Sequence, residues 1–246
     1  LNYVCPHDYG VGDLASAQKR LDEVRRLIRS TRPHRLIQIA VTEWNTTGGD
    51  MGLHRAGLWN LGNALACARY QNLLHRNADI VQIANRSNLA NSFCSGIIQT
   101  DNSRLYKTPT YWAQWLYSNK AGAKPLRIDP PAPLGSGLDV SSTLSENGKV
   151  LTTFVVNDSD EPVLKRFDLA PVKGTSSAEA WVLGDRDHAD SPDVSNSFDD
   201  PDRISVKHRE VKANSLRLPI RFEPYSLTVL QFTLTPGDLR KPSGSR

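Results

Sequence analysis

Several features that would assign the chain to a class are missing or scarce. No apolar run approaches the roughly 18 residues that a membrane-spanning helix needs. Only three cysteines occur, Cys5, Cys67 and Cys94, and none belongs to a C-x-x-C pair. Isolated cysteines in odd number cannot close a disulfide framework and do not match a zinc ribbon. The sequence therefore predicts neither a membrane protein nor a small fold held together by disulfides or zinc.

The motifs of several enzyme classes are absent as well. The six histidines show no H-E-x-x-H spacing, which excludes a zincin, and there is no G-x-S-x-G elbow, P-loop or G-x-G-x-x-G. Lys and Arg are not gathered with interleaved aromatic residues, as nucleic-acid-binding surfaces usually require. The densest basic stretch, residues 19–35, has the spacing of a solvated helix face, which we favour over a phosphate-binding patch. We expect no metal, no cofactor, and neither nucleic acid nor membrane as a partner.

What is present is a chain of 246 residues, which is enough for one large domain or two small ones with a sizeable core. The net charge of +4 is uneven: residues 1–120 hold 14 basic and 8 acidic side chains, and residues 121–246 hold 16 and 18. The chain opens with Leu1 rather than Met and has no signal peptide. We expect this opening to lie inside a longer reading frame, so secreted and cytoplasmic destinations both stay open.

Residues 1–122 alternate between strand-like and helix-like segments. Asp13 can cap a helix with apolar positions at helical spacing, including Leu21 and Leu27, that ends before Pro33. Strand–helix alternation implies right-handed crossovers and a parallel sheet. The few units present cannot close an eight-stranded barrel, so we predict an incomplete α/β segment, with a long loop before its last helix. The further segments are the apolar runs 36–41 and 80–84 and the helical patterns 53–74 and 111–117.

The composition changes near residue 121. Residues 123–133 are rich in proline and are typical of a linker. Seven short β-rich segments follow, and Asn147-Gly148 is a hairpin signal between two of them. Strands at this spacing predict a sandwich over residues 123–235, with a disordered tail at 236–246. The seven segments are 138–144, 150–156, 163–169, 179–183, 204–211, 215–220 and 226–234.

Glu43 is the strongest single candidate for chemistry. It lies at the carboxyl end of an apolar strand, where a carboxylate is costly unless it is hydrogen-bonded or used, and where α/β barrels carry their catalytic groups. The structural alternative is a Glu paired with a nearby Arg. Trp44 adjoins it, and because an indole beside a carboxylate suits a sugar face, we expect Trp44 to contact substrate. Its alternative role is packing at the rim.

Polar residues follow the other apolar segments at the same end. His7 and Tyr9 come after a short apolar segment at 3–5, a candidate strand end, and they could orient a carboxylate or bind hydroxyl groups. Asn88 follows the run 80–84 and could contact a ligand, as could its neighbours Asn85 and Asn91. Asp79 lies at the opposite end of that run and is expected to be a turn residue.

These motifs together resemble glycoside hydrolase family 51, the α-L-arabinofuranosidases, over nearly the whole chain but only the C-terminal part of a family member. His7-Asp8-Tyr9 is similar to the family's His-Tyr-Tyr at the end of barrel strand six, with Asp8 as a departure. Thr42-Glu43-Trp44-Asn45 resembles strand seven, and residues 78–91 resemble strand eight and its loop, where Asn88 replaces the usual Gln. Residues 196–201 and 224–230 resemble parts of the C-terminal sandwich.

The resemblance implies the C-terminal portion of a (β/α)8 TIM barrel followed by an antiparallel, jelly-roll-like β-sandwich. It implies a retaining hydrolase that releases terminal α-L-arabinofuranosyl residues from arabinose-containing oligosaccharides or polysaccharides. Glu43 would be the nucleophile, Tyr9 would orient it, and His7 and Asn88 would line the sugar subsite. The acid/base Glu would lie on barrel strand four, upstream of residue 1, so we expect this chain to be inactive without the missing N-terminal half.

Two other interpretations stay open at this point. The chain could be a non-catalytic, sugar-binding or structural fragment in which the sandwich is the stable unit. It could also belong to an endoglucanase-type member of the same family, whose site would be an open groove rather than a closed pocket. The natural polymer and the oligomeric state, including a homo-oligomer, are not fixed by the sequence.

Overall fold

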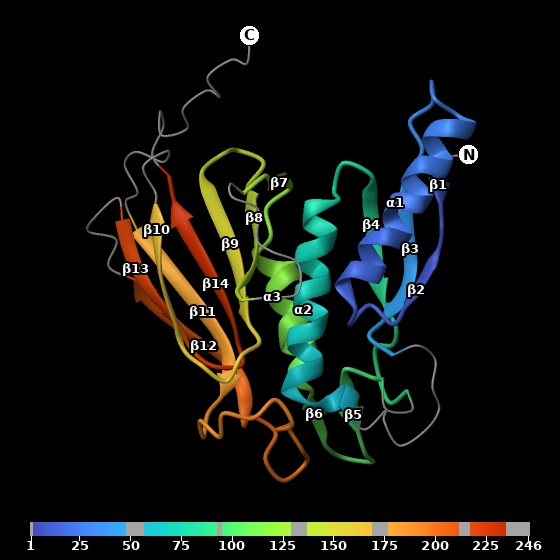
Figure 1. The fold of residues 1–246 in the computed structure, drawn as a ribbon. Helices are drawn as coiled ribbons and strands as arrows, with labels where there is room; N and C mark the ends of the chain where they lie inside the picture. Colours follow the sequence, from blue (N-terminus) through green and yellow to red (C-terminus); the bar gives the residue numbers. More distant parts are fainter. Residues whose placement is uncertain are drawn as a thin grey trace.

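The computed structural model describes residues 2–47, 57–92, 95–128, 137–168, 177–211 and 217–234. Its elements form neighbouring layers: a small parallel sheet with helix α1 (Leu14–Thr31), then helices α2 (Leu61–Arg76) and α3 (Pro109–Lys120), then two antiparallel sheets (Figure 1). No helix within these ranges is long and apolar enough to span a membrane. The expected disordered tail, 236–246, lies outside the described residues.

The first half contains the expected parallel sheet. Strand β3 (Gln38–Asn45) lies in its middle, with β4 (Val81–Arg86) on one side and β1 (Tyr3–Val4) and β2 (His7–Tyr9) along the other. Because every pairing is parallel, the carboxyl ends of these strands share one edge of the sheet. β3 continues past the apolar run because β2 pairs with its last residues, so Glu43 lies within the strand.

Helix α1 (Leu14–Thr31) begins where the sequence predicts. The carboxylate of Asp13 accepts hydrogen bonds from two backbone nitrogens of the first turn, at 3.1 and 3.2 Å. Its buried stripe runs through Leu21 and Ile28 and packs on the parallel sheet beside α2. Leu27 lies outside this stripe and is 62% exposed, so the expectation that it faces the core is wrong.

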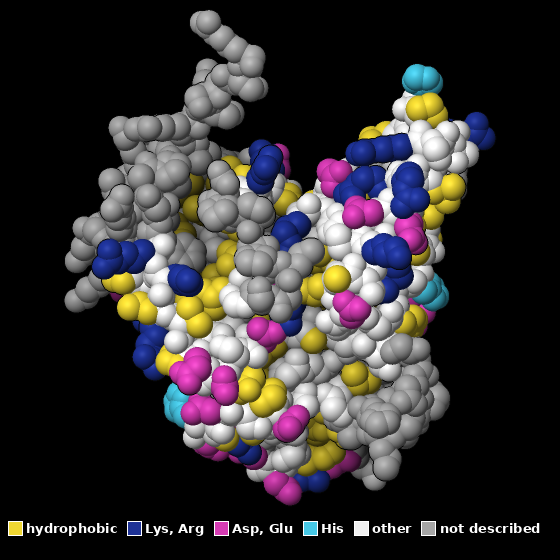
Figure 2. Space-filling model, in the orientation of Figure 1, with side chains coloured by type: hydrophobic (Ala, Val, Ile, Leu, Met, Phe, Trp, Pro, Cys, Tyr) yellow, Lys and Arg dark blue, Asp and Glu magenta, His cyan; other side chains and the backbone are white. Residues whose placement is uncertain are grey.

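The basic stretch of α1 forms a mixed face. Figure 2 shows Lys and Arg side chains over α1 interspersed with Asp and Glu. Arg25 lies 2.5 Å from Asp22 and 2.9 Å from Asp79, the residue expected to belong to the turn before β4. Part of the positive charge is therefore neutralised within the chain.

Helix α2 (Leu61–Arg76) is shorter than the predicted helix. Asn60 acts as its N-cap, with its side chain accepting a hydrogen bond from the backbone nitrogen of Asn63 at 2.8 Å. The predicted start at residue 53 is therefore too early, and residues 53–56 lie outside the described ranges. α2 is buried on two sides, because it contacts both the parallel sheet and the second half of the chain.

The predicted loop before the last helix contains a hairpin. Strands β5 (Ile98–Thr100) and β6 (Leu105–Lys107) pair antiparallel, and α3 (Pro109–Lys120) follows them. The turn between the strands is closed by Asp101, whose carboxylate accepts hydrogen bonds from two backbone nitrogens at 2.9 and 2.7 Å. This local turn chemistry explains why the segment is ordered.

The second half is a β-sandwich that contains all seven predicted strands. A short additional strand, β7, lies in the predicted linker, where Pro125 is tolerated because β7 is at the sheet edge. Gly148 has φ +71° in the predicted hairpin between β8 and β9. The six-stranded sheet has the order β12 (Ile204–Val211), β11 (Ser177–Asp185), β14 (Ser226–Thr233), β9 (Val150–Asn157), β8 (Asp139–Leu144) and β7 (Lys124–Leu126), and β10 (Val163–Asp168) pairs with β13 (Arg217–Phe222).

The six-stranded sheet is a middle layer with two apolar faces. Val155 and Leu230 face the two-stranded sheet, whereas Phe154 and Val229 face helices α2 and α3. Neighbouring residues on one strand thus enter different cores, which explains the nearly continuous burial of β9 and β14. The two halves of the chain consequently share one apolar core around α2 and α3.

Candidate active site

Glu43 lies at the carboxyl edge of the parallel sheet, and its side chain is 35% exposed. β2 places two residues beside it, since His7 pairs with Glu43 in the strand register. The Tyr9 hydroxyl donates a hydrogen bond to Glu43 Oε1, and His7 Nδ1 lies 3.3 Å from Glu43 Oε2. The structure therefore brings together three of the residues singled out from the sequence.

Ser87 completes this group and was missed by the sequence analysis. It directly follows β4, and its side chain is among the groups that lower the pKa of Glu43. Its backbone is fixed from both sides: its nitrogen donates to the carbonyl of Trp44 at 3.0 Å, and its carbonyl accepts from Asn45 Nδ2 at 2.7 Å. The sequence offers one signal for Ser87: it is a polar residue after a strand, on the same rim as Asn85 and Asn88.

These contacts set the electrostatics of Glu43. The hydrogen bond from Tyr9 lowers the pKa of Glu43 most, the hydrogen bond from Ser87 and the nearby His7 add to this effect, and burial opposes it. Within the described ranges no Arg pairs with Glu43, so the structural alternative of an Arg–Glu pair is not what holds it. The result is an ionised carboxylate, hydrogen-bonded on one side and open to solvent on the other.

Asp8 points to the other side of β2, toward the helices. Its side chain is 6% exposed, its carboxylate lies 2.6 Å from Arg20 Nε of α1, and it accepts a hydrogen bond from the Tyr70 hydroxyl of α2 at 2.8 Å. Burial, followed by the charge of Asp8, raises the pKa of Tyr70, which therefore stays a donor. The buried Asp8 carboxylate, paired with the half-exposed Arg20, thus holds β2 between its two Glu43-contacting residues, His7 and Tyr9.

Trp44 does not face the site. Its side chain has no exposed surface and packs against Tyr70, with ring centroids 4.9 Å apart. The expected sugar contact is wrong for this residue, because the strand turns its side chain to the helix-covered face. The alternative packing role describes it.

The three asparagines of the rim differ in their surroundings. Asn88 is exposed, and its Oδ1 accepts hydrogen bonds from Ser92 at 3.1 Å and Ser95 at 3.0 Å. Within the described part of the chain its amide nitrogen has no partner. Asn91 is used to hold the hairpin, since its Oδ1 accepts from the backbone nitrogen of Thr100 at 2.7 Å, whereas Asn85 is exposed.

This arrangement offers one activated carboxylate with a flanking hydroxyl, a phenol and an imidazole. Among the described residues no group of three His, Cys, Asp or Glu side chains could hold a metal ion. An ionised and partly exposed carboxylate such as Glu43 can act as a nucleophile or as a base.

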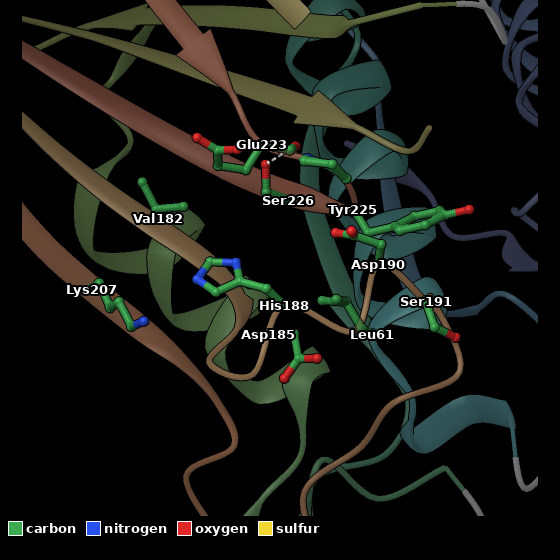
Figure 3. A pocket seen from close by; sticks show the side chains of 12 residues that line it. Leu61, Val182, Asp185, His188, Asp190, Ser191, Lys207, Glu223, Tyr225 and Ser226 are labelled. Carbon is green, nitrogen blue, oxygen red and sulfur yellow. Dashed lines mark hydrogen bonds between the residues drawn. The ribbon is translucent and has the colours of Figure 1, made fainter. Parts of the chain in front are cut away.

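A cavity of about 70 Å³ lies elsewhere, between the sandwich and the start of α2 (Figure 3). Leu61, His188, Asp190 and Tyr225 are among its lining residues, and none of the predicted site residues is. It has room for a few water molecules.

Comparison with known families supports the sequence resemblance. The family described as "Alpha-L-arabinofuranosidase C-terminal domain" matches residues 42–226, a range that includes Glu43 and most of the sandwich. No curated protein matches the chain.

Solved structures share the fold. The chain is similar to the α-L-arabinofuranosidase from Thermotoga maritima in complex with arabinose, with a TM-score of 0.79, 21% identity, and coverage of 95% of this chain and 53% of that chain. For the thermostable GH51 α-L-arabinofuranosidase from Thermotoga petrophila RKU-1 the values are 0.78, 21%, 94% and 52%. For CelM2, a bifunctional glucanase-xylanase from a metagenome library, they are 0.66, 15%, 96% and 44%. The chain thus spans about half the length of the first two enzymes.

Proposed function

Since the chain belongs to the α-L-arabinofuranosidase C-terminal domain family, we propose that it is the nucleophile-bearing part of a retaining glycoside hydrolase. The proposed reaction releases terminal α-L-arabinofuranosyl residues from arabinose-containing oligosaccharides or polysaccharides. Its main support is the setting of Glu43, an ionised and partly exposed carboxylate held by Tyr9 and Ser87 at the carboxyl edge of a parallel sheet.

The proposed architecture assigns residues 1–122 to the last three strands of an eight-stranded barrel and residues 123–235 to the sandwich. The covering of the parallel sheet supports this assignment, because α1 and α2 pack on one face only. On the other face, Ile83 is 41% exposed and Gln82 is exposed, although a barrel strand would face an interior there. Further strands supplied by the same enzyme would cover this face.

In the proposed mechanism Glu43 attacks the anomeric carbon and forms a glycosyl-enzyme, which water then hydrolyses. Tyr9 and Ser87 orient the carboxylate and keep it ionised near neutral pH. A second carboxyl group must protonate the leaving oxygen, about 5–5.5 Å from the nucleophile. No carboxylate of the described residues is among the groups that shift the pKa of Glu43. By the family resemblance the acid/base Glu belongs to barrel strand four, so we assign it to polypeptide outside these 246 residues and expect the chain alone to be inactive.

The sugar subsite is proposed to lie over the exposed side of Glu43. His7, whose side chain is 57% exposed, and the amide nitrogen of Asn88 offer hydrogen-bonding groups on the two sides of β3. Such neutral donors and acceptors suit the hydroxyl groups of a furanose. The substrate class follows from these groups together with the family.

The test uses the complete enzyme and an aryl α-L-arabinofuranoside. Glu43→Gln retains the shape of the side chain but removes the nucleophilic oxyanion, so kcat should fall by a factor on the order of 10⁴ or more. Asp79→Asn is the matched control, since Asp79 is an exposed carboxylate paired with Arg25 away from the site, and its activity should equal that of the wild type. Turnover by the Gln variant at the wild-type rate would refute the assignment.

A further inference from the structure

The loop between β11 and β12 extends from the sandwich to the rim that carries Glu43. In Figure 1 this orange loop lies at the same end of the molecule as the hairpin β5–β6 and the carboxyl ends of the parallel strands. We call its residues 192–199 the strap. The loop also includes the motif at 196–201, to which the proposed reaction gives no role.

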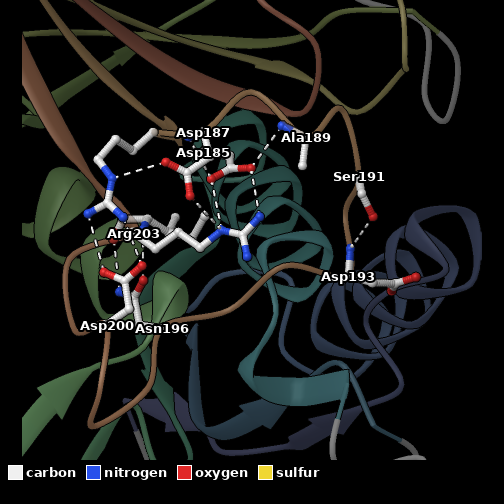
Figure 4. Close-up of polar contacts among 10 residues, drawn as sticks. Asp185, Asp187, Ala189, Ser191, Asp193, Asn196, Asp200 and Arg203 are labelled. Carbon is white, nitrogen blue, oxygen red and sulfur yellow. Dashed lines mark hydrogen bonds and ion pairs between the residues drawn. The ribbon is translucent and has the colours of Figure 1, made fainter.

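Ion pairs fix the base of this loop (Figure 4). Arg203 Nε lies 3.1 Å from Asp185, and Arg186 Nη2 lies 2.8 Å from Asp200. Burial opposes ionisation of Asp185, but the hydrogen bonds from Arg203 and from backbone nitrogens outweigh it and lower the pKa of Asp185. The two ends of the β11–β12 loop are therefore joined to each other by ion pairs, on either side of the strap.

The first half of the strap closes the start of α2. The backbone nitrogen of Leu61 donates to the carbonyl of Val194, and that of Gly62 donates to the carbonyl of Pro192, both at 2.8 Å. These are helix nitrogens that have no partner within the helix, so the strap satisfies them as a cap would. The approach is close, since a Cβ on Gly62 would lie 3.1 Å from Cβ of Pro192.

The start of α2 is in turn tied to the end of β3. Asn63 in the first turn accepts a hydrogen bond from the hydroxyl of Thr46, which follows the strand that carries Glu43. The amide of Asn63 also donates to Thr110 Oγ1 of α3 at 2.9 Å. The first half of the strap is therefore connected, through the first turn of α2, to Thr46 just after the strand that carries Glu43.

The second half of the strap holds the hairpin β5–β6. Asn196, which is buried, donates from Nδ2 to the carbonyl of Lys107 at 2.8 Å. The ring of Phe198 meets the ring of Tyr106 edge-on, with centroids 4.9 Å apart, and the guanidinium of Arg104 lies 4.9 Å from the Phe198 centroid. Phe198 thus contacts both Tyr106 of β6 and Arg104, the residue directly before β6.

The hairpin continues into the loop that carries Asn88. Backbone nitrogens of Ile97 and Ile98 both donate to the carbonyl of Leu89 at 3.0 Å, directly after Asn88. Ser95, close to the start of the hairpin, donates to Asn88 Oδ1 at 3.0 Å. The orientation of the Asn88 amide is therefore linked to the position of the hairpin.

We propose that the strap is a positioning element for the sugar subsite, in which Phe198 acts through the hairpin β5–β6 to hold Asn88 on the rim beside Glu43. Phe198 touches no reacting atom, so its effect is on how firmly the sugar is bound rather than on the chemical step. This inference rests on the proposed function for its kinetic consequence, whereas the link between Phe198 and the Asn88 loop stands on the contacts alone.

The test is Phe198→Ala in the complete enzyme, read by hydrogen exchange and by kinetics. We expect exchange at the amides of Ile97 and Ile98 to become at least about tenfold faster. KM for an aryl α-L-arabinofuranoside should rise by about threefold or more, with kcat changed by less than about twofold. Leu164→Ala, an apolar truncation at an exposed position of β10, should change neither the exchange rates of these amides nor KM.

Other variants separate positioning from general destabilisation. Phe198→Tyr keeps the ring against Tyr106, so the exchange rates of Ile97 and Ile98 and the KM should both equal the wild-type values. Should Phe198→Ala fail to fold, Arg104→Gln removes the guanidinium from the Phe198 ring at an exposed position and should move both quantities the same way, by less.

Three results would contradict either the proposed role of Phe198 or the proposed function. Unchanged hairpin exchange in Phe198→Ala would overturn the proposal, and so would faster exchange with an unchanged KM, which would leave the strap a purely structural role. Absence of turnover by the wild-type enzyme would refute the proposed function instead, and the exchange data would then decide the link between Phe198 and the Asn88 loop independently.

Discussion

Protonation of His75 is expected to destabilise the packing of α2 on the sandwich at acidic pH. His75 Nδ1 lies 2.9 Å from Ser141 Oγ of β8, and its ring packs edge-on against Phe154, with centroids 5.4 Å apart. Burial, followed by the charge of the adjacent Arg76, lowers the pKa of His75 from 6.5 to about 4. Arg76 is itself paired with Asp139, at 2.9 Å.

The sign of the effect follows from which state binds the proton more tightly. In the unfolded chain His75 binds a proton near pH 6.5, whereas in the folded chain it does so only near pH 4, so folding is favoured at high pH. The stabilisation is complete above pH 6.5 and is lost as the pH falls toward 4. At about 1.4 kcal/mol per pKa unit, the whole window corresponds to ~3 kcal/mol, of which ~2 kcal/mol is lost by about pH 5.

The assay is urea unfolding at pH 7.5, 6 and 5 for the wild type and for His75→Gln, which keeps a polar group near Ser141 but binds no proton. Between pH 7.5 and 5 the wild type should lose about 2 kcal/mol more of its unfolding free energy than the variant does. His34→Gln, at an exposed position, should follow the wild type. Parallel pH dependences for the wild type and His75→Gln would refute the reasoning.

Three further predictions concern the rim and the shared core. Tyr9→Phe removes the hydrogen bond that lowers the pKa of Glu43 most, so the acidic limb of kcat/KM should move to higher pH and kcat/KM at neutral pH should fall by about tenfold, as measured in a pH–rate profile of the complete enzyme. Asp8→Asn weakens the buried pair with Arg20 and should lower the unfolding free energy by about 1–3 kcal/mol in urea titrations, whereas a loss below ~0.5 kcal/mol would show that the pair is not structural. Residues 123–246 expressed alone should aggregate more than residues 1–246, because α2 and α3 cover one apolar face of the six-stranded sheet; size-exclusion chromatography of both chains decides between these outcomes.

The strands of the second half could be predicted because each carries its own local signal. Short apolar segments separated by turn residues mark their positions, and Asn147-Gly148 fixes one hairpin. β7 escaped prediction because a proline in a short segment usually indicates a linker, and only its place at the sheet edge makes it a strand. That the six-stranded sheet is covered on both faces depends on helices distant in sequence, which strand patterns do not report.

The site was predictable where position in a strand decides the role. Glu43 could be singled out because a carboxylate at the carboxyl end of an apolar strand is unusual, and Tyr9 and His7 follow from the same rim. Ser87 and Trp44 were not predictable, because a serine is common after any strand and the direction of an indole depends on whether a distant residue packs against it. Here Tyr70 does so from α2.

The most direct test of the central claim is to identify the residue that carries the glycosyl-enzyme. The complete enzyme would be treated with an arabinofuranoside that bears fluorine at C2 and an activated leaving group, because fluorine slows hydrolysis of the covalent intermediate through its oxocarbenium-like transition state. Mass spectrometry of the digested protein should then find the sugar on the peptide that contains Glu43 and none in the Glu43→Gln variant. A label on a different carboxylate in the wild-type enzyme would contradict the account.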